Sequence, residues 1–470
     1  MRVAVIGTGY VGLVTGACIA HLQHQVTCLD TDQAKIEELQ AGRVPIYEPG
    51  IDRLVSEQLA AGRLRFTTGP EDAIAAAEAV FICVGTPPQR TGQADTSAVE
   101  AAARAIGTHL GRRYCVVINK STVPIGSGDW VGMLVRQGAA RRAAFSPQRA
   151  TASSGADARA GGGTAVATAP PPTLSFDVVS NPEFLREGSA IADMLEPDCI
   201  VVGADNDRAV ERMRALYAPL LQRNAAAGRE VPFIVADRAS AEMIKYAANA
   251  FLATKISFIN EIANLCEHVG ADVCEVARGI GLDARIGSAF LNAGIGWGGS
   301  CFPKDLAALT HTAREYGYQA SLLEAVQSVN AMQRASVIRK LQARLKVIKG
   351  KTIALWGPAF KPETDDVRDA PALEIARRLS ELGAEVRAYD PQAGEAARRM
   401  GCSAELCADA YEAARGADAV VLVTEWPEFI SIQWSRLRSM MRRPILLDCR
   451  NALDPSAFLP YGFEYCGMGR

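Results

Sequence analysis

The 470-residue sequence lacks an excess of charge of one sign and lacks any apolar run long enough to span a membrane. Its 50 Lys and Arg residues nearly balance its 52 Asp and Glu residues, for a formal charge of −2. Nucleic-acid and membrane-surface proteins need a broad basic field, so we expect neither partner. The sequence opens on the apolar run Arg2–Ile6 without a basic leader, so we expect a cytoplasmic protein.

The sequence also lacks the cysteine spacing of a disulfide scaffold or a metal site. Its 12 cysteines are scattered, with no C-x-x-C pair and no close histidine cluster. Most cysteines are therefore expected to be reduced thiols, and no metal is expected.

Apolar patterning predicts an α/β fold with two doubly wound, Rossmann-like domains. Buried strands are expected at Arg2–Ile6, Gln25–Leu29, Ala79–Val84, Tyr114–Asn119, Phe176–Ser180, Cys199–Gly203, Lys351–Trp356, Glu385–Tyr389, Ala419–Thr424 and Ile445–Asp448. A long connecting helix is expected from Ala239 to about Val269. We predict a cofactor domain over 1–210, a central helical dimerisation domain over 211–335 and a nucleotide-sugar domain over 336–470.

Residues 138–172 are rich in Ala, Gly, Ser, Arg and Pro and have little apolar periodicity. Such composition predicts a flexible, low-complexity insertion.

Deleting residues 145–170 should therefore leave activity largely intact, because the stretch carries no functional motif. A turnover assay on the deletion variant checks this, and loss of folding would contradict it.

A glycine motif follows the first strand. Gly7, Gly9, Tyr10, Val11 and Gly12 lie in a G-x-G-x-x-G pattern, which allows a tight turn and close approach of a pyrophosphate. Asp30 ends the next strand, where its carboxylate can bind the adenosine ribose, so NAD is favoured over NADP. Lys35 either assists this contact or is a solvated lysine.

Further polar residues follow buried strands. Thr86 and Thr122 stand at strand ends, as cofactor-site hydroxyls or as ordinary turn residues before proline. Glu183 and Glu187 share a face if their segment is helical, and either supply a general base or form a solvated acidic turn.

Lys245 and Asn249 share one face of the long helix, where they either stabilise an oxyanion or lie at a solvated edge. Cys301 follows a stretch with four glycines and precedes Lys304 and Asp305. It is either a nucleophile, whose thiolate a nearby ammonium would favour, or a buried structural cysteine. In the C-terminal half, Lys361 and Arg368 follow a strand without a second dinucleotide motif, and either bind phosphates or are surface charges.

Taken together, these motifs closely resemble the UDP-glucose 6-dehydrogenase family. The resemblance covers almost the whole chain: Gly7–Gly12, Pro45–Gly50, Gly85–Pro88, Ser121–Pro124, Glu183–Gly188, Lys245–Glu261, Arg285–Asp305 and Phe360–Arg368. It implies NAD-dependent oxidation of the C6 alcohol of UDP-glucose to the carboxylate of UDP-glucuronate for polysaccharide biosynthesis, with two NADH produced and a thiohemiacetal and a thioester formed on Cys301.

The resemblance also implies roles for individual residues. Lys245 and Asn249 would stabilise an oxyanion, Asp305 with Thr122 and ordered water would move protons, and Glu183 would act in hydrolysis. Cofactor contacts would include Glu187, Lys304 and Arg368. Substrate contacts would be Glu183, Phe184, Leu185, Arg186, Glu187, Lys245, Asn249, Phe290, Leu291, Asn292, Ala293, Gly294, Gly298 and Lys361.

The resemblance further implies a homodimer, or a higher homo-oligomer, built through the central helix, with Arg285 reaching a neighbouring subunit's site. Two other functions stay open: a dehydrogenase of GDP-mannose or a UDP-N-acetylhexosamine, and a non-catalytic nucleotide-sugar-binding regulator.

Overall fold

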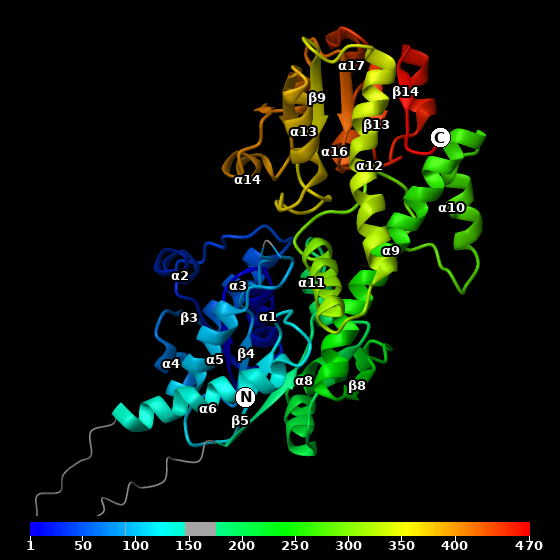
Figure 1. Ribbon diagram of the computed structural model, residues 1–470. Helices are drawn as coiled ribbons and strands as arrows, with labels where there is room; N and C mark the ends of the chain where they lie inside the picture. The colour runs from blue at the N-terminus through cyan, green and yellow to red at the C-terminus, as the bar shows by residue number, and fades with distance from the viewer. Residues whose placement is uncertain (90, 146–174) are drawn as a thin grey trace, which may run out of the picture.

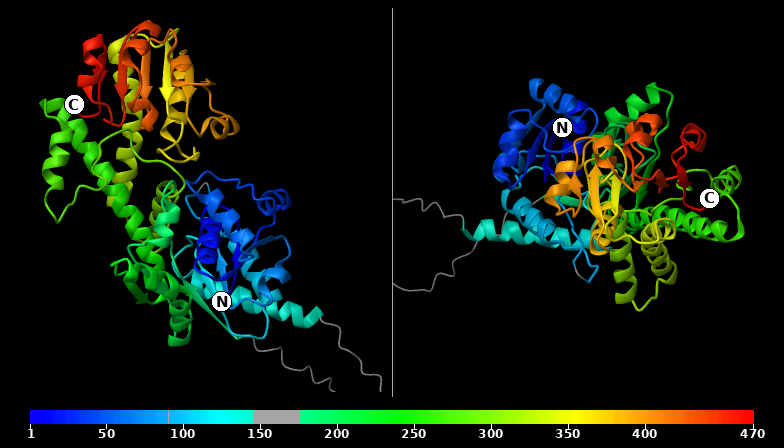
Figure 2. Two further views of the ribbon diagram at one scale, coloured as in Figure 1. Left: turned by 180° about the vertical axis from the view of Figure 1, so that it is seen from behind. Right: turned by 90° about the horizontal axis from the view of Figure 1, so that it is seen from above.

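A computed structural model describes residues 1–89, 91–145 and 175–470. Two α/β units lie at opposite ends of the molecule and are joined by the long helix α9 (Arg238–Val269) (Figure 1). The same separation is plain from behind (Figure 2, left). The expected α/β class with a long connecting helix is confirmed.

The N-terminal unit is built on an eight-stranded sheet of order β3-β2-β1-β4-β5-β6-β7-β8. Its neighbouring strands pair in parallel except for β6 and β7, which are antiparallel. The strands are β1 (Arg2–Ile6), β2 (Gln25–Leu29), β3 (Leu64–Thr67), β4 (Ala79–Ile82), β5 (Cys115–Asn119), β6 (Phe176–Ser180), β7 (Ile200–Gly203) and β8 (Phe233–Ala236). The helices are α1 (Tyr10–His21), α2 (Gln33–Gln40), α3 (Ile51–Ala60), α4 (Pro70–Ile74), α5 (Ser97–His109), α6 (Ser127–Phe145), α7 (Ala190–Leu195) and α8 (Asp207–Ala226).

The C-terminal unit has a six-stranded parallel sheet of order β11-β10-β9-β12-β13-β14. Its strands are β9 (Thr352–Trp356), β10 (Glu385–Tyr389), β11 (Glu405–Leu406), β12 (Ala419–Leu422), β13 (Ile445–Asp448) and β14 (Glu464–Cys466). Its helices are α13 (Pro371–Glu381), α14 (Gly394–Arg399), α15 (Ala410–Ala414), α16 (Pro427–Ile430) and α17 (Trp434–Met440), with 3-10 turns at Pro455–Ala457 and Leu459–Tyr461.

Three helices besides α9 form the middle: α10 (Val273–Gly281), α11 (Phe302–Glu315) and α12 (Ser321–Leu345). Helices α11 and α12 pack on α9. At the far end of α9, the Val273 amide donates to the Gly469 carbonyl at 2.9 Å, which joins the start of α10 to the end of the chain. The middle therefore contacts both α/β units.

The central strands of both sheets are fully enclosed. Every residue of β4 and of β12 is 0% exposed. These strands consist of apolar residues alone, which suit a parallel sheet covered by helices on both faces. Because parallel strands end at one edge, polar residues that follow β1, β4 and β5 are brought together there.

Five predicted strands have the predicted bounds, whereas β3, β8, β11 and β14 were not predicted. These four are short, and β8 has two exposed central residues, Ile234 and Val235. Because β8 belongs to the first sheet, that sheet extends past residue 210. The three-domain division stays a prediction.

The prediction that a flexible stretch begins at residue 138 is wrong at its start, because α6 continues to Phe145. Gly138 allows close helix packing: a Cβ atom there would lie 2.3 Å from the Arg104 carbonyl oxygen of α5. The Arg142 guanidinium also donates to the Leu110 carbonyl at 3.1 Å. Residues 146–172 of the predicted insertion lie outside the described residues.

Within the described part of the chain, no helix is both long and apolar enough to cross a bilayer.

Gly107→Ala should lower the stability of the N-terminal unit, because a Cβ atom there would lie 1.9 Å from the Val135 carbonyl oxygen of α6. Overpacking of this kind costs about 1–3 kcal/mol. Gly279→Ala in α10 is the matched control, since its Cβ would meet nothing within 4 Å. We expect thermal denaturation to show a lower midpoint for the first variant and an equal or higher one for the second. Equal midpoints in both variants would contradict the close packing of α5 and α6.

Candidate active site

A glycine-rich segment carries Cys301 between the long helix and the C-terminal unit. A Cβ atom on Gly298 would lie 2.3 Å from the Asp369 carbonyl oxygen, and one on Gly299 would lie 2.7 Å from the Phe360 ring. Gly299 also has a φ of +83°, which glycine adopts without strain. The glycines thus let the backbone pass close to the C-terminal unit and place Cys301 at the start of α11.

Cys301 opens onto a cavity of about 590 Å³. The predicted catalytic residues Lys245, Asn249 and Glu183 line the same cavity. Four predicted substrate residues line it too: Phe184, Leu185, Arg186 and Phe290. Segments that are far apart in the sequence, around residues 183–186, 245–249 and 290–301, therefore meet around one thiol.

A buried ion pair lies beside the thiol. The Lys245 ammonium is 3.1 Å from Glu183 Oε1, and the two side chains are 5% and 7% exposed. Burial alone would raise the pKa of Glu183, but the Lys245 ammonium and the Leu185 amide bring it below its ordinary value. Burial alone would lower the pKa of Lys245, but Glu183, Cys301 and Asp305 raise it. Both groups are therefore charged at neutral pH.

A second acid, Asp305 of α11, contacts Asn249, which lies one turn after Lys245 on α9. Asp305 is 2% exposed and accepts a 2.6 Å hydrogen bond from the Asn249 amide. The Lys304 ammonium donates to its other oxygen at 2.5 Å. The Asn249 donor that was predicted to face an oxyanion therefore contacts Asp305 in this state.

The nearby ammonium groups favour the Cys301 thiolate, as expected, but burial keeps the pKa of the thiol above its ordinary value. Burial raises the pKa of the thiol, and the Glu183 carboxylate raises it further. Lys245 and Lys304 lower it but do not outweigh burial. The thiol is therefore protonated at rest, and a base must take its proton before it acts as a nucleophile.

The segment that carries Glu183 and Glu187 is not helical, so the two carboxylates do not share a face. Pro182 precedes it, and the Leu185 amide donates to Glu183 at 2.6 Å. Glu187 instead faces the C-terminal unit. Its carboxylate accepts from Thr364 at 2.9 Å and from Arg368 at 3.4 Å, and its carbonyl accepts from the Lys361 ammonium.

These contacts make Glu187 a link between the two α/β units. Burial and the nearby Asp366 carboxylate raise the pKa of Glu187 to about 7, against the opposing effect of Arg368. Ser300, next to Cys301, also donates to Glu187, at 3.4 Å.

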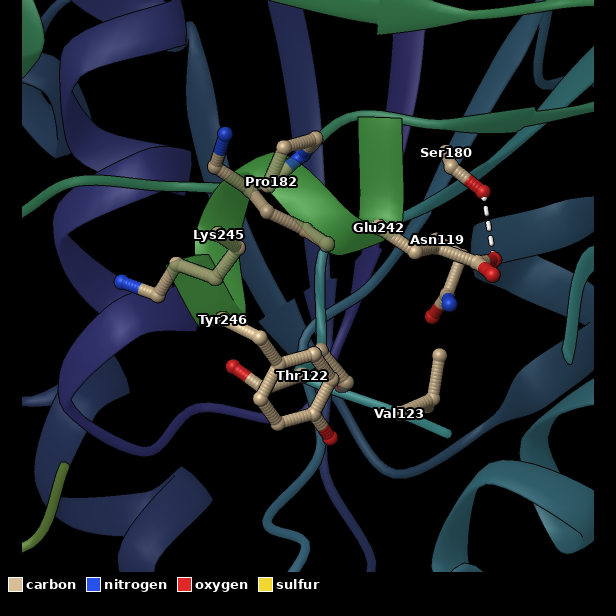
Figure 3. A pocket seen from close by; sticks show the side chains of 10 residues that line it. Asn119, Thr122, Val123, Ser180, Pro182, Glu242, Lys245 and Tyr246 are labelled. Carbon is tan, nitrogen blue, oxygen red and sulfur yellow. Dashed lines mark hydrogen bonds between the residues drawn. The ribbon is translucent and has the colours of Figure 1, made fainter. Parts of the chain in front are cut away.

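Thr86 and Thr122, predicted separately, are in contact. The Thr86 hydroxyl donates to the Thr122 carbonyl at 2.8 Å. Thr122 also lines a small cavity of about 20 Å³ together with Lys245, Tyr246 and Glu242 of α9 (Figure 3). Such a volume accommodates about one water molecule. The ordered water expected beside Thr122 therefore has room next to Lys245.

The glycine motif has the geometry of a dinucleotide site. Gly7 has a φ of +95°, and a Cβ atom on Gly12 would lie 1.9 Å from the Gly7 carbonyl oxygen. Gly9 precedes α1 without a side-chain cap, and a Cβ atom there would meet nothing within 4 Å. A phosphate can therefore approach the free amides of this helix.

Asp30 is positioned for a ribose. Its Oδ2 accepts from the Thr8 amide at 2.8 Å and the Thr8 hydroxyl at 2.7 Å, and Lys35 lies 3.2 Å away. Hydrogen bonds to Thr8 and the charge of Lys35 outweigh burial and lower the pKa of Asp30. This carboxylate stays ionised, which disfavours the 2′-phosphate of NADP.

Other predicted site residues lie apart from the Cys301 cavity. Leu291, Asn292 and Ala293 line a separate cavity of about 370 Å³ with Arg450. The Gly294 amide donates to Asn260 at 2.8 Å. Arg285 is exposed and pairs with its own neighbour Asp283.

Several buried polar residues had no predicted role. Lys120 lines the Cys301 cavity and is 4% exposed. Glu242 accepts from Ser180 at 2.8 Å and from the Gly126 amide at 2.6 Å. Glu48 accepts from the Tyr10 hydroxyl and from the Gly188 amide. A charged residue directly after a buried strand was the available signal for Lys120.

The described residues contain no group of three or more His, Cys, Asp or Glu that could hold a metal ion.

Comparison with protein-family models assigns all three parts of the chain. Residues 1–221 match the NAD binding domain of the UDP-glucose/GDP-mannose dehydrogenase family, residues 239–332 its central domain and residues 354–455 its UDP binding domain. The chain belongs to this family. NAD is accordingly the cofactor of the N-terminal unit.

Relatives of this dehydrogenase match along the entire chain. The UDP-glucose 6-dehydrogenase of Rhizobium meliloti (strain 1021) is 45% identical over 474 residues, covering 100% of both chains. UDP-glucose 6-dehydrogenase TuaD of Bacillus subtilis (strain 168) is 44% identical, covering 100% of this chain and 93% of that one. The structure of a UDP-glucose dehydrogenase from Pyrobaculum islandicum superposes with a TM-score of 0.83 at 36% identity, covering 96% of this chain and 94% of that one.

The raised pKa of Glu187 predicts a pH-dependent stability of this dehydrogenase. Between the ordinary value of 4.5 and about 7, the folded protein holds a proton that the unfolded chain has lost. The contribution of Glu187 to the free energy of unfolding therefore falls as pH rises through this window. Glu187→Gln cannot ionise, so its melting temperature relative to the wild type should rise from pH 4.5 to pH 7 and level off above.

Differential scanning fluorimetry across this pH range measures the difference. The control is Glu71→Gln, a change on an exposed side chain of α4, which should give no such rise above pH 5. A difference for Glu187→Gln that is constant from pH 4.5 to pH 8 would contradict the burial of an ionisable Glu187 between the units.

Proposed function

We propose that this protein is an NAD-dependent UDP-glucose 6-dehydrogenase, which oxidises C6 of UDP-glucose by four electrons to give UDP-glucuronate and two NADH. One observation carries the proposal: the Cys301 thiol shares its cavity with the Lys245–Glu183 ion pair. A simple alcohol dehydrogenase has no need of a buried thiol, whereas oxidation of an aldehyde requires a nucleophile that adds to it first.

The N-terminal unit holds the cofactor. Gly7, Gly9 and Gly12 leave room for its pyrophosphate, and Asp30 and Lys35 receive its ribose. NAD⁺ bound there would supply the hydride acceptor for each of the two oxidations at C6. Further contacts come from Tyr10, Val11, Thr86, Thr122, Glu187, Lys304 and Arg368.

Lys245 and Asn249 act on the substrate oxygen. The Lys245 ammonium stabilises negative charge that develops on the C6 oxygen, and Asn249 aligns Asp305 beside it. Asp305, with Thr122 and a water in the small cavity, takes the proton that the alcohol releases.

Cys301 then adds to the aldehyde. Its sulfur bonds to C6 as the C=O π bond opens, and the proton released by the thiol passes to the former carbonyl oxygen, which completes a thiohemiacetal. Loss of the hydride and of the hydroxyl proton converts this adduct into a thioester. Covalent attachment keeps the aldehyde in the cavity between the two oxidations.

Glu183 serves the last step. It takes one proton from a water whose oxygen bonds to the thioester carbon, the C–S bond breaks, and the electron pair leaves on the Cys301 sulfur. Because Glu183 is ionised by its pairing with Lys245, it is ready to accept this proton.

The nucleotide sugar is held by both halves of the chain. Residues 183–186 and Phe290 line the sugar cavity, and Lys361, in the loop after β9, supplies a cation for a phosphate. The segment Leu291–Gly294, with Gly298, continues from this cavity toward the C-terminal unit.

We propose that two copies associate through α9. Phe251, Phe258 and Leu265 recur every seven residues along this helix and are 65%, 50% and 54% exposed. Such a stripe of large apolar side chains is typical of an interface. Arg285, exposed near this helix, is then available to a partner subunit's site. The thiol chemistry suits a reducing compartment, the cytoplasm, and the product would supply polysaccharide biosynthesis.

The number of NADH molecules formed per sugar tests the function. Purified protein with limiting UDP-glucose and excess NAD⁺ should give two NADH per sugar at 340 nm. One NADH per sugar would indicate a simple alcohol dehydrogenase, and turnover only with GDP-mannose or a UDP-N-acetylhexosamine would reassign the substrate. No NADH with any nucleotide sugar would favour a non-catalytic regulator.

Cys301→Ser should lose net turnover, by about a thousandfold or more, as is typical when a covalent nucleophile is removed. UDP-glucose and NAD⁺ should still bind, because the cavity and the glycine motif are unchanged. Steady-state kinetics and calorimetric binding measure the two effects. Cys466→Ser, a buried cysteine of β14 in the C-terminal unit, is the control and should keep its turnover. Wild-type turnover in Cys301→Ser would remove Cys301 from the mechanism.

A further inference from the structure

Lys120 is a buried cation that the reaction as described does not use. It follows β5 directly, is 4% exposed, and lines both the Cys301 cavity and the small cavity beside Thr122. Burying an ammonium costs several kcal/mol unless acceptors or counter-charges surround it. The burial of the Lys120 ammonium therefore calls for a physical explanation.

The direct contacts of Lys120 compensate its charge only in part. Its ammonium donates to Asn181 Oδ1 at 3.3 Å and lies 5.9 Å from the centre of the Phe81 ring. The same Asn181 oxygen already accepts from the Tyr217 hydroxyl at 2.7 Å. Among the residues that the structure describes, no carboxylate oxygen lies within 4.0 Å of the Lys120 ammonium, so Lys120 forms no ion pair there. An ammonium has three N–H donors, so donors remain for the cavity.

Glu183 is the carboxylate on which Lys120 acts at longer range. Burial lowers the pKa of Lys120, and the charges of Cys83 and Glu183 oppose this decrease. In turn, the Lys120 charge contributes to the lowered pKa of Glu183, after the larger contribution of Lys245. One buried carboxylate is thus stabilised by two ammonium groups.

The two ammonium groups differ in their availability. In the proposed reaction Lys245 must also stabilise the substrate oxyanion. While the Lys245 ammonium interacts with this oxygen, its ion pair with Glu183 is weaker. A buried carboxylate that loses its only counter-ion takes up a proton. Glu183 would then be unable to accept the proton of the hydrolytic water.

We propose that Lys120 is a positioning residue for thioester hydrolysis, which keeps Glu183 ionised while Lys245 is engaged by the substrate oxygen. The proposal rests on the function proposed above. It assigns hydrolysis two cations with separate tasks: Lys245 contacts the reacting oxygen, and Lys120, which lines the same cavity as Glu183, acts through its charge.

Lys120→Gln and Lys120→Arg separate charge from hydrogen bonding. Glutamine can still donate to Asn181 but is neutral, whereas arginine keeps the charge. Removing the charge raises the pKa of Glu183, so the acid limb of the kcat–pH profile should move to higher pH by about one unit in Lys120→Gln. The acid limb of the kcat–pH profile of Lys120→Arg should lie at the same pH as that of the wild type.

The titratable groups around Glu183 are the ammonium groups of Lys245 from α9 and Lys120 after β5, and the thiols of Cys83 after β4 and Cys301 before α11. Only Lys120 changes in this comparison, so a shift of the acid limb is assigned to its charge. A rapid-mixing experiment should still show a burst of NADH in Lys120→Gln, because both oxidations precede hydrolysis, followed by a slower steady state near pH 6.

The proposal is overturned if Lys120→Gln keeps the wild-type acid limb, including the case in which its kcat falls equally at every pH, as a merely structural role predicts. If Lys120→Gln does not fold by circular dichroism, Lys120→Met is measured in its place with the same criterion. Wild-type protein that forms no NADH from UDP-glucose would instead refute the proposed function, which keeps the two failures distinct.

Discussion

The buried ion pair between Lys245 and Glu183 is the constraint on which the site depends. It joins the long helix α9 to the loop that follows β6, and it lies where the thiol, the sugar cavity and the small water-sized cavity meet. Both charged groups lose their hydration when the pair forms. Removing one partner would leave the other as an unpaired buried charge, which typically lowers the free energy of unfolding by about 3–5 kcal/mol. The pair also keeps a base ionised next to a thiol that burial holds protonated.

The remaining architecture serves to bring other groups to this pair. Glycines at 298 and 299 let the segment before α11 pass against the C-terminal unit, so that Cys301 and Asp305 reach the cavity. Glu187 then links the loop to Thr364 and Arg368 on the other side. Cofactor and nucleotide-sugar halves are therefore connected through the residues that flank the reacting atoms.

Much of the fold could be predicted from the sequence because buried parallel strands are continuous apolar runs. Strands such as Arg2–Ile6 and Glu385–Tyr389 have their predicted bounds, and the glycine motif lies at the predicted turn. Strand β8 was missed because its residues are partly exposed, and the end of α6 was missed because Gly138 serves helix packing and does not begin a loop.

The site was predictable as a set of residues but not as a set of contacts. Cys301, Lys245, Asn249 and Glu183 do share a cavity. The partners of Glu187 could not be predicted, because they lie across the molecule and depend on how the two units meet. The protonation of Cys301 depends on the balance between burial and four nearby charges, which spacing in the sequence does not reveal. Lys120 was not predicted, because its position after a buried strand does not reveal that it is buried and lines the Cys301 cavity.

Direct detection of the acyl group on Cys301 tests the central claim. Glu183→Gln, which slows hydrolysis, is mixed with UDP-glucose and NAD⁺, quenched in acid and analysed by peptide mass spectrometry. The account predicts that the Cys301 peptide carries the UDP-glucuronyl group as a thioester, one per active site, and that the peptides of the other cysteines do not. Full oxidation of the sugar with no adduct on Cys301, or an adduct on a different residue, would contradict it.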